Sequence, residues 1–177
     1  MGILRTMTNY NYEEFDSLHW RDSKLITTEE VLDFLDIYYT CPLREGRITS
    51  LIAEGFTYTS MYKTSQELYL YKDHELAIWD DVMESNKSER VAKPNRLSIL
   101  ESARVFHLAS CMLAARKVFM SEVGRKYFLL HKHEEFLDKT PLQWIMEGRA
   151  GTLRVMNFLE SLPEWNLIPH RYYRSLF

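Results

Sequence analysis

The fold is decided by residues 96–163, which read RLSILESARVFHLASCMLAARKVFMSEVGRKYFLLHKHEEFLDKTPLQWIMEGRAGTLRVMNFLESLP. Three helix-start signals divide this stretch, and each precedes an apolar run: Ser98-Ile99-Leu100-Glu101, Ser121-Glu122 and Thr140-Pro141. A serine or threonine hydroxyl caps an amide of the first turn, and a proline at the first helical position loses no hydrogen bond. The signals predict a long helix to Phe119 or Met120, a shorter helix after Ser121, a short helix after Thr140 and, past Gly148, a last helix that ends at Pro163.

Apolar residues set the expected buried face of each helix. In the long helix the expected polar positions are Glu101, Arg104 and His107, and apolar residues cover most of the rest, which is typical of a helix packed on several sides. The expected apolar face of the second helix is Val123, Tyr127, Phe128 and Leu130. The polar loop that follows is expected to be anchored by Phe136 and Leu137. The expected core below the last helices is Trp144, Val155 and Leu159.

The preceding residues predict more helices, so we expect an all-α protein. A capping box at Thr27-Thr28-Glu29-Glu30 opens a helix whose expected buried stripe is Val31, Leu32, Leu35 and Tyr38. A second helix is expected to end at Gly55. Residues 56–62 alternate with a period near two, which leaves a short strand and a loop open. A capping box at Thr64-Ser65-Gln66-Glu67 then predicts two helices with a turn near Lys72-Asp73, roughly a helix-turn-helix outline.

The order and spacing of the signals after residue 96 resemble a known family, the C-terminal toxin-binding domain of Xre/MbcA/ParS-type antitoxins. The matching residues are Leu97, Ser98, Glu101, Ser102, Arg104, Ala115, Val118, Phe119, Thr140, Pro141, Leu142, Gly151, Val155 and Leu159. The family usually has a Pro-Asn and a Gly-Gly turn before Thr-Pro-Leu, whereas this chain reads HKHEEFLDK there. We therefore expect an aromatic arm over 1–26, a helical, degenerate helix-turn-helix-like module over 27–95 and a compact toxin-binding-type domain over 96–177.

The resemblance implies a protein that binds and neutralises a partner, by family a RES-domain toxin that consumes NAD, and covers its active site. It implies that the last helix and the aromatic, basic tail contact the toxin, although a tail that caps its own domain stays open. The expected contact residues are Arg149, Arg154, Asn157, Trp165, Arg171, Tyr172, Tyr173, Arg174 and Phe177. Family habit also implies a homodimer. The mechanism needs no cofactor and no metal.

The segment before the long helix argues against ordinary DNA reading. Residues 73–85 contain no lysine or arginine and carry Asp73, Glu75, Asp80, Asp81 and Glu84, which the phosphates on either side of a groove would repel. The next loop could still touch phosphates through Lys87, Arg90, Lys93 and Arg96. Two alternative functions stay open: a DNA-binding repressor, and a stand-alone inhibitor, for instance phage-encoded, that presents the acidic face to a host nucleic-acid-binding protein.

Composition and spacing give no sign of an enzyme. His107 and Cys111 lie four residues apart, but zinc needs about four ligands, and core packing is the favoured interpretation. His131, His133, Glu134 and Glu135 are interpreted as a solvated turn. The net charge of −3 gives no overall attraction to nucleic acid or an anionic membrane, and no apolar run approaches the roughly 20 residues of a membrane span. We expect a cytoplasmic protein without membrane contact, whose cysteines, Cys41 and Cys111, stay reduced.

Overall fold

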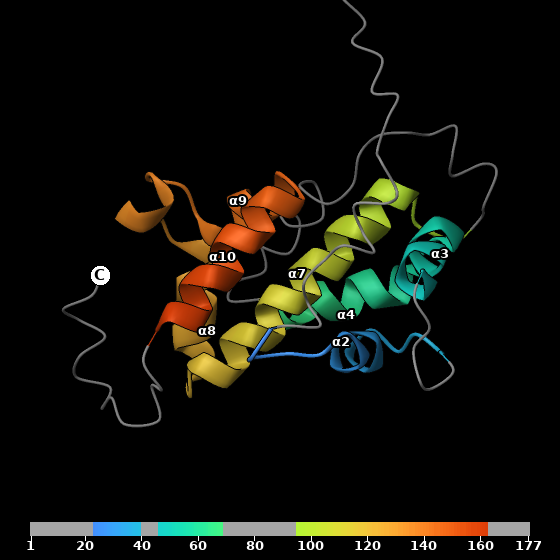
Figure 1. Cartoon of the computed structure of the whole chain (residues 1–177), viewed down its shortest axis with the longest axis horizontal. Helices are drawn as coiled ribbons and strands as arrows, with labels where there is room; N and C mark the ends of the chain where they lie inside the picture. Colours follow the sequence, from blue (N-terminus) through green and yellow to red (C-terminus); the bar gives the residue numbers. More distant parts are fainter. Residues whose placement is uncertain (1–22, 40–45, 69–94, 163–177) are drawn as a thin grey trace, which may run out of the picture.

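The computed structural model describes residues 23–39, 46–68 and 95–162, and these residues form an all-α fold (Figure 1). Its helices are α2 (Thr28–Phe34), α3 (Arg47–Glu54), α4 (Tyr58–Leu68), α7 (Ile99–Val118), α8 (Glu122–Leu130), a 3₁₀ turn (Glu134–Phe136), α9 (Pro141–Met146) and α10 (Arg149–Ser161). The helix-turn-helix outline beyond residue 68, the acidic face and the tail lie outside the described residues.

Helix α7 is the centre of the described fold, because each of the other six α-helices packs against it. In Figure 1 it runs between α10 on one side and α4 and α2 on the other. This surrounding corrects the expected polar stripe, since Glu101 and His107 are buried. Buried small residues such as Ala103, Ser110 and Ala114 let neighbouring helices approach its axis closely.

The helix starts were predicted correctly wherever a capping residue opens a described helix. Thr27, Ser98 and Thr140 each accept a hydrogen bond from the third helical amide, and the side chain at that third position, Glu30, Glu101 or Gln143, bonds back to the cap amide. Ser121 accepts from the amide of Gly124. These bonds satisfy amides that have no partner inside the helix, so they fix where each helix begins.

Helix α4 corrects two expectations. Residues 58–62 are helical and form neither a strand nor a loop, although Thr57 makes an isolated bridge to Arg96. The sequence at Thr64 is not a helix start, because it lies in the second half of α4, where the Thr64 hydroxyl donates to the Ser60 carbonyl at 2.8 Å. The hydroxyl of Ser65 likewise donates to the Tyr62 carbonyl. A capping-box pattern also fits a helix interior when its hydroxyls can bond to the preceding turn.

Three apolar residues expected inside the protein face outward. Tyr38 is 86% exposed because α2 ends at Phe34, four residues before it. Val123 is 68% exposed, and the buried positions of α8 are instead Lys126, Phe128 and Leu129. The Lys126 ammonium pairs with Glu122 one turn earlier at 2.6 Å. Leu137 is 67% exposed, whereas Phe136 beside it is buried as expected.

Two polar contacts join the described N-terminal residues to helices α10 and α7. The hydroxyl of Ser23 donates to the Glu160 carboxylate at 2.6 Å, across 137 positions of sequence. The ammonium of Lys117 pairs with Glu30 at 2.6 Å, which ties the start of α2 to the last turn of α7. Both pairs hold the described N-terminal residues against the C-terminal helices. Within the described ranges, no helix combines the length and the apolar character that crossing a membrane requires.

Candidate functional site

Three of the nine expected partner-contact residues lie in the part of the chain that the structure describes, and all three belong to α10. They are Arg149, Arg154 and Asn157, while Trp165, Arg171, Tyr172, Tyr173, Arg174 and Phe177 lie outside it. The acidic residues 73–84 and the basic residues Lys87, Arg90 and Lys93 also lie outside it. The described site is therefore built around α10 and the loop that precedes α9.

Arg149 faces the interior more than the solvent. It is half-buried at the start of α10, and its charge acts on His107, which is buried in the middle of α7. Burial first, and then the Arg149 charge, lower the pKa of His107 to about 4, because both oppose a second positive charge there. At neutral pH the imidazole is therefore uncharged, and the charge of Arg149 acts on a buried residue of its own chain.

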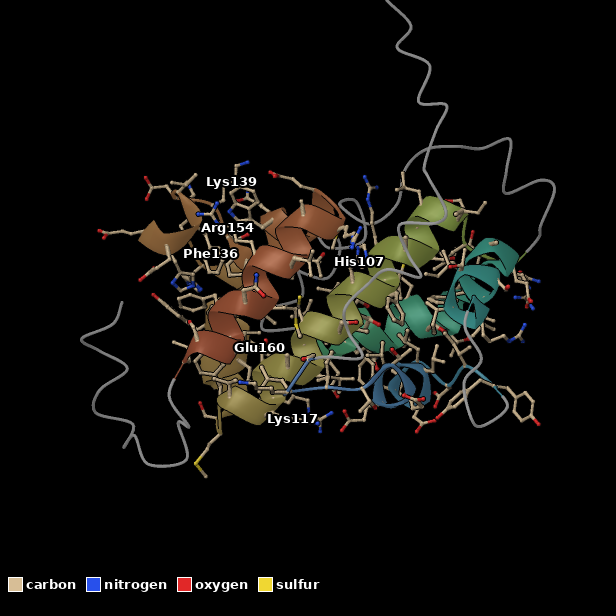
Figure 2. All side chains as sticks on the ribbon, in the orientation of Figure 1. His107, Lys117, Phe136, Lys139, Arg154 and Glu160 are labelled. Carbon is tan, nitrogen blue, oxygen red and sulfur yellow. The ribbon has the colours of Figure 1, made fainter. Side chains whose placement is uncertain are left out.

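Arg154 is exposed, but its guanidinium is held by two groups of its own chain. Its Nη2 donates to the carbonyl of Glu135 at 2.8 Å, and its Cζ lies 4.6 Å from the centre of the Trp144 ring. The Lys139 ammonium lies at the same distance, 4.6 Å, from that ring centre. Figure 2 shows Lys139, Arg154 and Phe136 near one another at the upper left of the view, above Glu160 and Lys117. Arg154 therefore has a structural role beside its expected contact with a partner.

Trp144 links these side chains to the backbone of the loop. Its indole Nε1 donates to the Phe136 carbonyl at 2.8 Å. The Phe136 ring packs inward, with centroids 6.1 Å from Phe128 and 5.2 Å from Phe158. Two adjacent carbonyls of the loop, those of Glu135 and Phe136, are thus held from outside by Arg154 and Trp144, and the ring between them is anchored in the core.

The loop of residues 133–139 closes on itself. The amide of His133 donates to the Lys139 carbonyl, and the amide of Asp138 donates to the His133 carbonyl, both at 3.3 Å. Inside the loop, Leu137 (φ 56°, ψ 49°) and Asp138 (φ 57°) adopt the left-handed conformation. Aspartate tolerates this conformation, but leucine rarely adopts it, since its Cβ crowds the backbone. The loop therefore places a strained residue at its tip.

We name the outward-facing residues of this loop the loop tip; they are Glu134, Glu135, Leu137 and Asp138, all exposed. Within the described part of the chain, none of its three carboxylates forms an ion pair. The tip thus presents one apolar side chain among three negative charges. Asn157, the third expected contact residue, is exposed one turn beyond Arg154 on α10.

Three of the side chains considered for metal or nucleophilic chemistry lie against backbone carbonyls: Cys111, His131 and His133. Burial raises the pKa of the Cys111 thiol well above its ordinary range, and the thiol points to the Thr152 carbonyl. His131 and His133 each place a ring nitrogen against a backbone carbonyl, of Tyr127 and Phe128 respectively. Over residues 23–39, 46–68 and 95–162, no three His, Cys, Asp or Glu residues come together as metal ligands could.

Arg96, one of four basic residues that could touch phosphates, bonds within the fold. Its Nη1 donates to the Gly55 carbonyl at 2.6 Å, which joins the end of α3 to the residues before α7. The backbone there is close-packed, because a Cβ at Gly55 would overlap the Leu97 carbonyl. This arginine therefore serves the junction between the two halves of the described fold.

The loop tip is the feature that sequence reasoning missed. Leu137 was expected to point inward beside Phe136, because two adjacent apolar residues in a polar loop suggest a joint anchor. In the sequence, the one signal for a left-handed turn is Asp138, a residue type that tolerates it.

No protein-family model and no curated protein sequence matches the chain.

Proposed function

We propose that this protein is an antitoxin-like binding protein that neutralises a RES-domain, NAD-consuming toxin by covering its active site. The proposal begins from the sequence resemblance over residues 96–163. The loop before α9 supports it most directly: its backbone holds two left-handed residues, Leu137 and Asp138, shortly before Thr140-Pro141-Leu142. Glycine is the usual residue at left-handed positions in loops, and the family has its Gly-Gly turn in this loop.

A second contact is consistent with the resemblance. Gly151, which matches the family pattern, lies where α10 crosses the end of α9, and a Cβ there would overlap the Trp144 carbonyl. A glycine at this position lets the two helices approach closely enough to bring Arg154 over Trp144. The matching glycine thus supports the geometry of the proposed binding surface.

The proposed mechanism is steric and electrostatic. The exposed face of α10, the loop tip and the aromatic, basic tail would cover the entrance of the toxin, so that NAD cannot enter. Aromatic and arginine side chains provide most of the affinity in protein interfaces, and the tail carries both. We further propose that the protein acts in the cytoplasm. We also propose that it is a homodimer, and light scattering of the purified full-length chain tests this oligomeric state.

Co-expression with a RES-domain toxin tests the proposal. Wild-type protein is expected to preserve cell growth and cellular NAD. A chain ending at Leu162 is expected to fail, once circular dichroism shows that it remains folded. A full-length chain with Asp80, Asp81 and Glu84 each changed to lysine is expected to keep its activity.

The same variants separate the alternatives. If the charge reversal abolishes activity and the tail deletion does not, the protein is an acidic-face inhibitor of another target. If the protein leaves the toxin active and shifts DNA of its own promoter in a salt-dependent manner, it is a repressor.

A further inference from the structure

One side of α8 carries apolar side chains that the described residues leave exposed. Met120, just before the helix, is 71% exposed, and Val123 in its first turn is 68% exposed. Tyr127, which is half-buried, follows four residues later, so the three positions share one side at the spacing of three and four residues that helix contacts use. Phe128 and Leu129 bury the opposite side of the helix. We name Met120, Val123 and Tyr127 the α8 seam.

The C-terminal end of α10 lies beside α8. The ring of Phe158, near the end of α10, stacks on the ring of Phe128 with a centroid distance of 5.8 Å and 8° between the ring planes. The Phe128 centroid is also 5.1 Å from that of Phe119, the residue before Met120. Figure 1 accordingly shows the last turn of α10 next to α8. The chain therefore leaves α10 close to the helix that carries the seam.

The chain leaves α10 in an extended conformation. Leu162, which follows α10, has φ −69° and ψ 134°, and Pro163 comes next in the sequence. A residue before proline avoids the helical region, which explains why the helix ends here. Extended chain advances about 3.3 Å per residue and a helix rises about 1.5 Å per residue, so an extended segment about half as long as α8 spans it. Residues 163–168 are long enough for this.

The sequence after Leu162 supplies apolar side chains within that length. Residues 163–168 read PEWNLI and include Trp165, Leu167 and Ile168. Covering these side chains and the seam with one another removes apolar surface from water on both sides, which is favourable. Met120 suits a contact with tryptophan, because its thioether is adaptable and packs well against aromatic rings.

We propose that residues 163–168 of this chain lie along the α8 seam in the free protein, with their three large apolar side chains against it. The segment is the chosen occupant because it begins where α10 meets α8, starts out extended and is long enough to span the helix. The inference does not rest on the function proposed above. A toxin that binds the tail would compete with the seam for it, so the test uses the free protein.

Photo-cross-linking of the purified full-length protein tests the contact. The photoreactive residue p-benzoylphenylalanine replaces Val123, whose exposed side chain leaves room for it, and mass spectrometry maps the linked residues. We expect most cross-links to join position 123 to residues 163–168 of the same chain. The same photoreactive residue at Tyr38, which is 86% exposed after α2, is the matched control. We expect it to give at least tenfold fewer cross-links to that segment.

Variants of the tail separate binding from proximity. A full-length chain with Trp165→Ser, Leu167→Ser and Ile168→Ser is expected to cross-link position 123 to residues 163–168 at least fivefold less than wild type. The matched control, Tyr172→Ser with Tyr173→Ser, changes two large side chains farther along the tail and is expected to stay within twofold of wild type. Equal cross-linking in these two variants would show that the segment passes near α8 without binding it, and would overturn the inference.

The remaining outcomes identify another occupant and also overturn the inference. Cross-links from position 123 to residues 1–22 would place the aromatic arm on the seam, since the hydrogen bond from Ser23 to Glu160 brings the end of that arm to α10. Cross-links between two chains would place a second copy there. Cross-links to none of these segments would show that the seam is open to solvent. The toxin-neutralising function is decided separately, by the co-expression experiment.

Discussion

The indole nitrogen of Trp144 lies 2.8 Å from the carbonyl oxygen of Phe136 and donates a hydrogen bond to it across eight positions of sequence. This bond joins the first turns of α9 to the loop that carries the strained Leu137. Phe136, the residue before Leu137, is therefore held in two ways: its ring is buried and its carbonyl accepts this hydrogen bond.

We expect Trp144→Phe to destabilise the protein by about 1 kcal/mol, since it keeps most of the ring and leaves the Phe136 carbonyl without its donor. Urea unfolding measures the free energy, and hydrogen exchange of the amides of residues 133–139 measures the loop. We expect faster exchange in the loop and unchanged exchange in the middle of α7. Equal exchange of the loop amides in the wild type and in Trp144→Phe would show that the bond does not hold the loop.

Arg154 and Trp144 are expected to act as one unit. Arg154→Ala removes the bond to the Glu135 carbonyl and the stacking on Trp144, and each contributes about 0.5–1 kcal/mol at an exposed site. In a double-mutant cycle with Trp144→Phe, the two losses are expected to be non-additive because the residues are in contact. Asn157→Ala, on the same helix, is the control and is expected to change stability by less than about 0.5 kcal/mol.

Stability is expected to fall between about pH 6.5 and pH 4, because the pKa of His107 is about 4 in the folded protein and ordinary in the unfolded chain. In this range the unfolded state binds a proton that the folded state excludes, so the unfolding free energy rises with pH. The whole effect is on the order of 3 kcal/mol, at 1.36 kcal/mol per pKa unit. Urea unfolding at a series of pH values measures it.

His107→Gln is expected to flatten that dependence, because glutamine replaces the buried imidazole with a side chain that does not titrate. The carboxylate of Glu30 acts at lower pH: the hydrogen bond from Lys117 is the first cause of its lowered pKa, so its contribution is lost as the pH falls below the ordinary glutamate pKa and through the folded pKa. An unchanged slope in His107→Gln would show that burial of this imidazole does not control acid stability.

Helix starts could be predicted from the sequence because capping is a local interaction. Ser98 and Glu101 are three residues apart, and their two hydrogen bonds depend on nothing beyond that turn. The pattern at Thr64 shows the limit of such local reasoning. Thr64 and Ser65 are buried against the rest of the fold, which favours a helix interior over a helix start. The four residues of the capping-box pattern carry no information about this burial.

Helix faces were predicted less well because they depend on neighbours that the sequence does not reveal. His107 has a polar ring, yet six helices surround α7 and bury it. In α8, Lys126 is buried and Val123 is exposed, because a lysine can place its stem inside and reach Glu122 with its ammonium. Leu137 follows the same logic, since the anchoring of Phe136 decides which way the next residue points.

The last prediction concerns the contact between α9 and α10. Gly151→Ala is expected to destabilise the protein by about 2 kcal/mol or more, because the added methyl group overlaps the Trp144 backbone, which cannot move as a side chain would. The displacement also shifts Arg154 relative to the Trp144 ring, so binding of the proposed partner, a RES-domain toxin, should weaken together with stability. Ala150→Ser, at the exposed neighbouring position, is the control and should change neither quantity. A stable Gly151→Ala protein would mean that the two helices lie farther apart than this geometry requires, and Arg154 would then reach the Glu135 carbonyl without that close approach.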